Sequence, residues 1–244
     1  MDVMETGAAP RAQSSAGAAV LERAEPALRM PYDYAQGEIY YVENLAELPP
    51  RRLYDALKRL FDFAASLIAL PVLLVPMLVI AALVRISSPG PVIYRQERLG
   101  LNGKPFEILK FRTMRDHAEE GGAQWCDGED DARVTRVGRT LRKYHLDELP
   151  QLLCTLCGAM TLVGPRPERA CFYEAFEEHV HGFSERLRVK PGITGLAQVE
   201  GGSALAPHEK VALDVKYIKN RSLGLDLRIL FKTVRIVLQR SGAQ

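Results

Sequence analysis

The sequence predicts a mainly helical α+β fold, and three patterns in the chain of 244 residues lead to that expectation. A long apolar stretch follows residue 60 and has the length of one extended helix. Two short runs of β-branched and aromatic residues stand between turn signals, which predicts a small hairpin. The C-terminal region repeats apolar residues at helical spacing. We therefore expect a long N-terminal helix, a hairpin and surface amphipathic helices.

Composition divides the chain into an acidic lead-in and a basic body. Residues 1–50 hold eight acidic and three basic residues, which leaves 29 of the 32 bases and 22 of the 30 acids for the rest. Because the lead-in begins with few large apolar residues, we expect 1–50 to be a partly disordered extension, with "PYDYAQGEIYYVENL" as a short strand or docking segment. A basic body favours anionic partners: phosphates, nucleic acid or acidic lipid headgroups.

Four cysteines are too few and too unevenly spread for a secreted disulfide scaffold, so a reducing compartment is expected. They are Cys126, Cys154, Cys157 and Cys171. Cys154 and Cys157 form one CxxC in a helical apolar pattern, but no second pair stands at the spacing of a zinc site. The pair therefore favours packing over metal binding.

Residues 51–88 contain the apolar segment. From Phe61 to Val84 the only charge is Asp62, and a helix of this length exceeds the ~30 Å hydrocarbon core of a bilayer. A buried helix of a soluble core is the alternative, although such helices are normally shorter and amphipathic. Pro71 and Pro76 each remove an amide donor, so a bend is expected, with Ser66 as one hydroxyl partner for the freed backbone groups.

Basic residues flank both ends of this segment: Arg51, Arg52, Lys58 and Arg59 before it, and Arg85, Arg95 and Arg98 after it. The positive-inside rule therefore predicts that both ends of the apolar segment lie in the cytoplasm. A helix that enters the membrane, turns and leaves satisfies this rule and the prolines together. The sequence thus predicts a re-entrant, monotopic anchor, with residues 89–244 as a cytoplasmic domain.

The runs "VIYRQ" and "FEILKF" stand between turn signals at residues 89–91 and 102–103 and predict the hairpin. Basic residues recur between its apolar ones, so one side of the hairpin is able to present cations. Near the C-terminus, "LDLRILFKTVRIVLQR" has the pattern of an amphipathic helix. That pattern is equally compatible with a helix at headgroup level and with a helix packed on the protein core.

In "RKYHLDELPQLL" two acids, Asp147 and Glu148, precede Pro150. The residues fit the start of a helix, where Asp caps, Glu is favourable and Pro is tolerated. The basic residues around them indicate an anionic ligand. A second stretch, "TLVGPRPER", places Arg166 between two prolines, where a guanidinium loses little entropy on holding a phosphate. No Walker loop and no GxGxxG after a strand is present.

Taken together, the motifs resemble those of the bacterial sugar transferases, the monotopic polyprenol-phosphate phosphoglycosyltransferases. The match runs from about residue 52 to residue 242. The motifs stand in the family's order: "KRLFD", "GPVIYRQERLG", "LKFRTM", "LRKYHLDELPQL", "GAMTLVGPRP", "PGITGLAQV" and "NRSLGLDL".

The resemblance implies an enzyme that transfers a sugar 1-phosphate from a UDP-sugar to polyprenyl (undecaprenyl) phosphate and releases UMP. It implies Asp147 as the nucleophile that becomes a covalent aspartyl phosphosugar, and Glu148 as a residue that helps to hold Mg²⁺. The residues implied in substrate or phosphate binding are Lys110, Arg142, Arg166, Pro167 and Asp226. If Asp147 begins a helix, the helix dipole lowers its pKa and keeps it ionised.

The resemblance also implies the cytoplasmic face of a bacterial inner membrane as the location, membrane lipids as partners and no nucleic acid, and it is compatible with a homodimer. The expected reaction is the first membrane step of lipid-linked glycan or exopolysaccharide synthesis. Cys154 and Ala159 depart from the family pattern, which commonly has Asn and Asp there, and Thr161 replaces a common Ser. These departures could alter packing, metal affinity or rate.

Two alternatives remain. A hydrolase with paired carboxylates is disfavoured, because neighbours in sequence point in different directions and do not flank one bond. A non-catalytic membrane scaffold that retains the fold draws slight support from Cys154 and Ala159. The intact Asp147, Glu148 and Arg166 argue against the scaffold.

Overall fold

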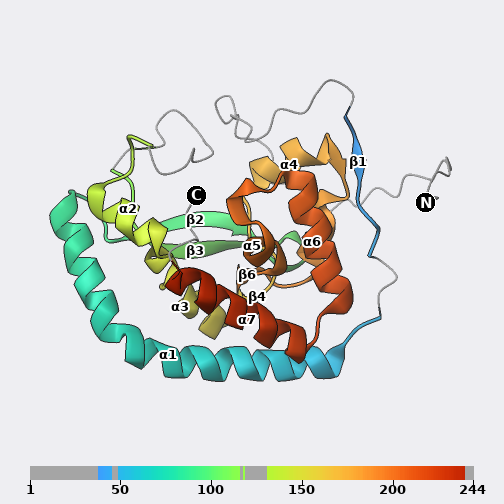
Figure 1. Cartoon of the computed structure of the whole chain (residues 1–244), viewed down its shortest axis with the longest axis horizontal. Coiled ribbons are helices and arrows are strands. Elements are labelled where there is room, and N and C mark those ends of the chain that lie inside the picture. Colours follow the sequence, from blue (N-terminus) through green and yellow to red (C-terminus); the bar gives the residue numbers. More distant parts are fainter. Residues whose placement is uncertain (1–37, 46–48, 116–117, 119–130, 240–244) are drawn as a thin grey trace.

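The computed structural model describes residues 38–45, 49–115, 118 and 131–239, and it has the expected mainly helical α+β fold (Figure 1). The helices are α1 (Arg52–Ser87), α2 (Arg136–Lys143), α3 (Gln151–Cys157), α4 (Ala170–Glu177), α5 (Leu196–Glu200), α6 (Pro207–Asn220) and α7 (Leu223–Leu238). The strands are β1 (Tyr40–Tyr41), β2 (Ile93–Leu99), β3 (Pro105–Phe111), β4 (Thr161–Val163), β5 (Val180–His181) and β6 (Gly192–Thr194). Short 3-10 helices are η1 (Leu101–Gly103), η2 (Leu146–Glu148), η3 (Phe183–Arg188) and η4 (Gly202–Ala204). The expected disorder of the N-terminal extension lies mostly outside the described residues.

Helix α1 is one element of 36 residues that contains both Pro71 and Pro76. Figure 1 shows it running along the lower edge of the molecule and then bending upward. A bend is the expected result of two prolines, because each removes an intrahelical hydrogen bond and crowds the preceding turn. The expectation that Ser66 supplies a hydrogen bond there is wrong: its buried hydroxyl has no hydrogen-bond partner among the described residues.

The apolar side chains of α1 are mostly exposed. In its most apolar window only 11% of the residues are buried, and by length and composition the helix is able to cross a membrane. A helix of a soluble core would bury such side chains. Its second half does pack on the body, where Ile80 and Val84 join Phe111 of β3 and Leu141 of α2 in one apolar cluster.

The predicted hairpin is present, and its strands are longer than the two runs that indicated it. Strands β2 and β3 pair antiparallel, from Ile93 opposite Phe111 to Leu99 opposite Pro105. Asn102 at the tip has a φ of 57°, a left-handed conformation that asparagine tolerates better than most residues. Ile108 of β3 faces Cys154 and Met160, so the hairpin covers α3.

The residues before α1 are bound to the same body as the residues after it. Strand β1 pairs in parallel with β5, and the backbone amide of Leu45 donates to Glu185 Oε2 at 2.8 Å. Leu45 itself is 2% exposed and belongs to the main core, which α4, η3, α6 and α7 complete. The predicted strand in this segment is therefore confirmed. The residues before α1 and the residues after it belong to one folded unit.

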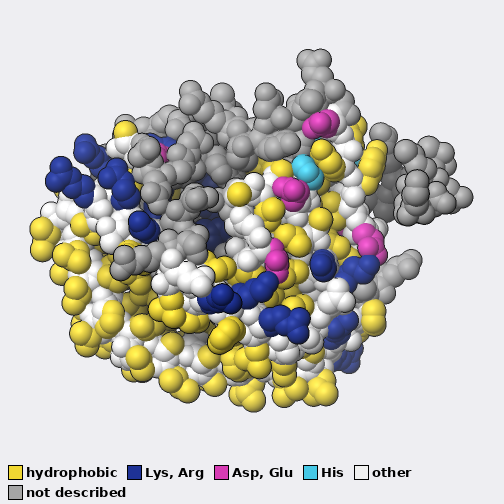
Figure 2. Space-filling view, viewed as in Figure 1, with side chains coloured by type: hydrophobic (Ala, Val, Ile, Leu, Met, Phe, Trp, Pro, Cys, Tyr) yellow, Lys and Arg dark blue, Asp and Glu magenta, His cyan; other side chains and the backbone are white. Residues whose placement is uncertain are grey.

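Helix α7 packs on the protein core with one side and leaves apolar side chains exposed on another, so the core interpretation is confirmed and the headgroup interpretation stays a prediction. Ile229 is 1% exposed and packs in the main core, whereas Phe231 is 75% exposed. Other exposed apolar residues of the helix are Leu227, Val234 and Leu238. In Figure 2 hydrophobic side chains line the lower and left margins along α1, and Lys and Arg side chains gather over α7 and beside α2.

The contact of Leu45 with the core predicts a measurable loss of stability. We expect Leu45→Ala to lower the free energy of unfolding by about 2–4 kcal/mol, because a buried leucine leaves a cavity when truncated. Thermal or denaturant unfolding of the detergent-solubilised chain measures it. Ile39→Ala, in the same segment but at a side chain 49% exposed, is the matched control and is expected to change little. Equal effects of the two variants would contradict the packing role of this segment.

Candidate active site

The two acids lie on η2, a single 3-10 turn between α2 and α3. His145 precedes them in a left-handed conformation with a φ of 55°, which ends the α2 direction. Helix α3 begins only at Gln151, with Pro150 at its N-cap and no side-chain cap. The prediction that Asp147 caps a helix is therefore wrong, because the left-handed residue and the following 3-10 turn separate Asp147 from the α3 amides.

Glu148 is held by two cations from different elements. Lys110 Nζ of β3 lies 2.8 Å from Glu148 Oε1, and Arg166 Nη2, from the turn after β4, lies 2.7 Å from the same oxygen. Burial alone would raise the pKa of this carboxyl, but Arg166 and Lys110 outweigh burial and hold the pKa well below its usual range. Glu148 is thus ionised and fixed.

Asp147 differs from its neighbour in both environment and contacts. Its side chain is buried, and burial followed by the charge of Glu148 raises the pKa of Asp147 above its ordinary value, although Lys110 and Arg142 act in the opposite direction. The prediction of a lowered pKa is wrong in direction, since no α3 amide reaches this carboxyl. No hydrogen bond or ion pair to Asp147 comes from the described residues. One acid is locked and the other is available.

Arg142 lies on α2 next to the pair, and its Nε donates to Thr113 Oγ1 at 2.9 Å. Its charge lowers the pKa of Asp147, which places the guanidinium within electrostatic reach of that carboxyl. The structure therefore brings Lys110, Arg142 and Arg166 around the two acids, as the sequence predicted.

The turn that carries Arg166 is held by two arginines to which the sequence assigned no such role: Arg186 was not named, and Arg98 was named only as a base that flanks the apolar segment. Arg186 Nη2 donates to the Arg166 carbonyl at 3.0 Å, and Arg98 Nη1 lies 2.9 Å from Glu168 Oε2 and 3.4 Å from the Pro167 carbonyl. Pro167 thus contributes its carbonyl and its stiffness. Buried arginines that bind backbone carbonyls leave no sequence signal distinct from surface arginines, which explains why they were missed.

Close glycine contacts fix the same turn. An added Cβ at Gly192 would lie 2.1 Å from the Gly164 amide nitrogen, and one at Gly164 would lie 2.5 Å from the Lys190 carbonyl oxygen. Larger residues would separate the parallel strands β4 and β6. The glycine-rich loop of the sequence therefore supports Arg166 by allowing two backbones to approach.

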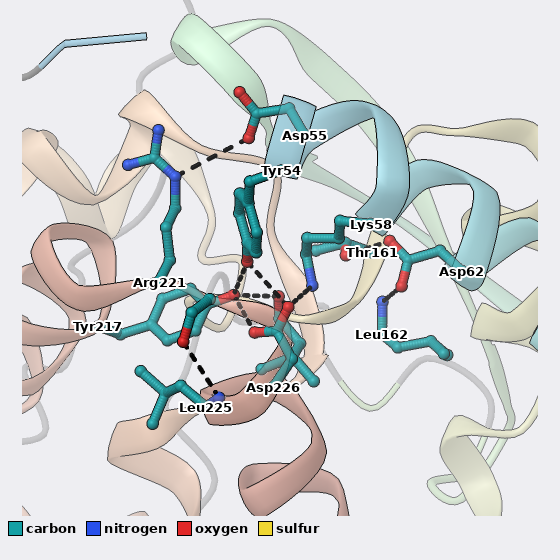
Figure 3. A network of polar contacts seen from close by, with 12 residues as sticks. Tyr54, Asp55, Lys58, Asp62, Thr161, Leu162, Tyr217, Arg221, Leu225 and Asp226 are labelled. Carbon is teal, nitrogen blue, oxygen red and sulfur yellow. Dashed lines mark hydrogen bonds and ion pairs between the residues drawn. The ribbon is translucent and has the colours of Figure 1, made fainter. Parts of the chain in front are cut away.

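Asp226 lies in a different network, shown in Figure 3. Its carboxylate is 3% exposed and accepts from Tyr54 at 2.8 Å and from Lys58 at 2.9 Å, both on α1, and it lies 2.8 Å from the Tyr217 hydroxyl of α6. A buried carboxylate engaged in this way joins α1, α6 and α7. The expectation that Asp226 binds phosphate finds no support in these contacts.

A second polar contact lies one turn further along α1. Asp62 accepts from the Thr161 hydroxyl and, at 3.2 Å, from the Leu162 amide, and Figure 3 shows it beside the Asp226 network. The only acid in the apolar segment is therefore a structural link between α1 and β4. Thr161 keeps the hydroxyl that the common Ser would offer at this position.

The two carboxylates fit a divalent cation that arrives with a phosphorylated substrate. Within the described residues, no group of three or more His, Cys, Asp or Glu side chains is placed to hold a metal ion. Mg²⁺ is commonly bound by one or two carboxylates, with substrate phosphates and water completing the octahedron. Asp147 and Glu148 supply two such carboxylates.

The family is established by comparison with known proteins. Residues 53–240 match the family model described as bacterial sugar transferase. The chain belongs to this family, so the resemblance and the expectation of a transferase enzyme are confirmed.

Three relatives illustrate the similarity. One from Aeromonas hydrophila, a UDP-N-acetylgalactosamine-undecaprenyl-phosphate N-acetylgalactosaminephosphotransferase, is 43% identical over 82% of this chain and 48% of its own length. One from Caulobacter vibrioides, a UDP-glucose:undecaprenyl-phosphate glucose-1-phosphate transferase, is 43% identical over 80% of this chain and 74% of its own. The exopolysaccharide production protein PSS of Rhizobium leguminosarum bv. phaseoli is 40% identical over 75% and 96%. The chain thus spans about half of the first relative and most of the other two.

The buried pair behind Arg166 predicts a pH effect on stability. Arg186 and Asp214 lie 2.7 Å apart, and burial raises the pKa of Asp214 from 3.8 to about 6 despite that arginine. Between about pH 4 and pH 6 the folded chain therefore keeps a proton that the unfolded chain has released, so stability falls as the pH rises through this window. Between these two pH values, the wild type is expected to lose about 1–3 kcal/mol of unfolding free energy relative to Asp214→Asn. Denaturant unfolding at each pH measures the difference, and a difference that stays constant from pH 4 to pH 7 would contradict it.

Proposed function

We propose that the chain transfers a sugar 1-phosphate from a UDP-sugar to undecaprenyl phosphate, as the first membrane step of exopolysaccharide or other lipid-linked glycan synthesis. The observation that carries the proposal is the contrast between the two acids. Glu148 is pinned between Lys110 and Arg166, while the adjacent Asp147 has no hydrogen-bond partner among the described residues. The names of the relatives from Aeromonas hydrophila and Caulobacter vibrioides, which specify a UDP-sugar and undecaprenyl phosphate, support the substrate classes.

In the first step an Asp147 carboxylate oxygen attacks the phosphorus bonded to the sugar. The bond from that phosphorus to the bridging oxygen breaks, and its electron pair leaves with UMP. In the second step a phosphate oxygen of undecaprenyl phosphate attacks the same phosphorus, and the Asp147 carboxylate is released. Dividing the transfer in this way lets one bulky anion leave before the next arrives.

The side chains around the pair suit the charge that moves. Arg166 is partly exposed while it contacts Glu148, so it is able to reach a diphosphate and remain oriented. Arg142 and Lys110 add positive charge near the attacking carboxylate. When bound, Mg²⁺ would be held by Glu148 together with substrate phosphates and would neutralise diphosphate oxygens. The raised pKa of Asp147 makes its carboxylate a stronger nucleophile once ionised.

Removing the nucleophile is expected to abolish turnover without harming the fold. Asp147→Asn should reduce UMP release by roughly 10³-fold or more in nanodiscs with Mg²⁺, polyprenyl phosphate and a panel of UDP-sugars. Asp147 is a buried acid beside another acid, so removing its charge is expected to leave the melting temperature of the variant equal to or above that of the wild type. A loss of turnover without a loss of stability separates catalysis from folding. A non-catalytic scaffold would release no UMP from either protein. Full activity of the variant would overturn the nucleophile assignment.

The covalent step and the metal have separate readouts. Incubation with a UDP-sugar and no lipid is expected to release UMP and to add one sugar phosphate to Asp147, detected by intact and peptide mass spectrometry. UMP release that depends strictly on lipid would favour direct transfer. Glu148→Gln is expected to lose turnover and to need more Mg²⁺ for its residual activity. A residual rate that is unchanged across Mg²⁺ concentrations would reject the metal role of Glu148.

We further propose that α1 is a re-entrant anchor and that the body lies at the cytoplasmic face of the bacterial inner membrane. The pairing of β1 with β5 supports this topology, because it attaches the residues before α1 to residues after it. Arg51 adds to the attachment by donating to the Lys219 and Arg221 carbonyls at the end of α6. Helix ends that belong to one body are not able to lie on opposite faces of a bilayer.

Cysteine labelling tests this topology. In a background without the four native cysteines, Tyr41→Cys and Lys216→Cys place reporters at exposed positions before and after α1. Both are expected to react with a membrane-impermeant maleimide only after inside-out vesicles expose the cytoplasmic face. Labelling of the two positions from opposite sides would contradict the re-entrant anchor.

A further inference from the structure

A second concave site lies apart from the two acids, between the hairpin tip and the end of α3. It is a shallow pocket of about 280 Å³, lined by residues 100–102 and 104–106, by Gly158 and Ala159 after α3, and by Lys190 before β6. Neither acid of η2 lines it, and neither does Lys110, Arg142 or Arg166. The pocket is therefore distinct from the cluster of side chains around Asp147 and Glu148.

The charges of this pocket are one-sided. Its charged lining residues, Lys104 and Lys190, are both basic. The Arg59 guanidinium lies 3.2 Å from where a Cβ on Gly158 would stand, although it also donates to the Thr155 and Leu156 carbonyls at the end of α3. Burial together with Arg59 lowers the pKa of Lys190, and the acid that acts in the opposite direction is Asp62, whose carboxylate already accepts from Thr161 and Leu162. The pocket thus concentrates positive charge that an anion would balance.

The two lysines extend from a fixed backbone. Each precedes a proline, and the residue before a proline is confined to extended conformations. The Lys104 carbonyl accepts from the Gly100 amide at 2.9 Å, and the Pro191 carbonyl accepts from the Thr161 amide at 2.9 Å. Because both Cα atoms are held, little backbone entropy is lost when the ammonium groups close on a ligand.

The position of the pocket indicates where the anion comes from. Arg59 belongs to α1, and its guanidinium also lies 5.8 Å from the Phe63 ring centroid. The neighbouring Leu60 is 65% exposed and Phe63 is 41% exposed, on the half of α1 that precedes the prolines. In the proposed re-entrant anchor, on which this placement rests, these side chains face lipid and Arg59 brings the pocket near the depth of headgroups, where phosphate is the abundant anion.

We propose that this pocket binds a phosphate group, supplied by the headgroup of an anionic membrane phospholipid, between Lys104 and Lys190. The site goes beyond the proposed transfer reaction and serves to hold the body at the membrane surface. Free phosphate has the same recognition chemistry, and the experiment below distinguishes the two sources.

Ala159 contributes a small, uncharged side chain to the wall of the same pocket as the two lysines. A carboxylate at this position would oppose their charge and compete with an incoming phosphate. The residue present here therefore leaves the positive charge of the pocket uncompensated on this side.

The test measures lipid binding rather than turnover, so its outcome is independent of the proposed transferase activity. The full chain in neutral detergent is titrated with phosphatidylglycerol, with phosphatidylcholine and with inorganic phosphate, and bound molecules are counted by native mass spectrometry. The variants are Lys104→Gln with Lys190→Gln, Ala159→Asp, and two controls. Ala159→Asn has the size of aspartate without its charge, and Lys216→Gln removes an exposed lysine of α6 outside the pocket.

We expect the wild type and both controls to bind phosphatidylglycerol in preference to phosphatidylcholine. The double lysine variant should bind it roughly 10- to 30-fold more weakly, and Ala159→Asp should weaken it in the same direction. Unchanged binding by these two variants, or an equal loss in Lys216→Gln, would overturn the site. Displacement of phosphatidylglycerol by millimolar phosphate would overturn the lipid headgroup as the occupant and assign the free ion instead.

Discussion

The attachment of both ends of α1 to one body is the constraint on which the rest of this structure depends. Strand β1 reaches β5 before the helix begins, and Arg51 binds the last carbonyls of α6. The first half of α1 is then tied down by polar contacts, through Lys58 to Asp226 and through Asp62 to β4. Because these links are buried and charged, breaking one would leave an uncompensated charge. An apolar helix of 36 residues is thus held in one orientation on the folded body.

That orientation gives the active site its setting. Strand β3 packs its apolar side chains against the second half of α1 and against α3, and the same strand presents Lys110 to Glu148. Arg166 approaches from the turn after β4, which Asp62 of α1 also contacts through Leu162. The helix proposed to enter the membrane and the side chains proposed to hold the diphosphate are therefore connected through the same short strands. Such a connection would keep the site at a constant depth relative to a lipid-borne acceptor.

The departures from the family pattern fall outside the site. Cys154 packs with Ile108 and Met160, where its thiol lies 3.6 Å from the Glu107 carbonyl oxygen. It therefore replaces a polar side chain with a compact apolar one in a small core. Ala159 lines the basic pocket, away from the two acids. Neither change touches Lys110, Arg142 or Arg166, so the slight support that the departures offered to a non-catalytic scaffold is removed by their location.

The sequence by itself determined the features whose signal is local: the long apolar helix with its prolines, the hairpin and its turn, and the cations that gather around Asp147 and Glu148. Hydrophobic periodicity and turn residues express such features directly. Only the tertiary structure decided that Glu148 is bound by two cations while Asp147 has no such partner among the described residues. It also decided that the Asp226 carboxylate accepts hydrogen bonds from α1. Finally, it placed Arg98 and Arg186 against the turn that carries Arg166. The direction of the pKa shift of Asp147 was misjudged because Asp147 does not begin a helix and because its burial, which depends on segments distant in the sequence, raises the pKa together with the charge of Glu148.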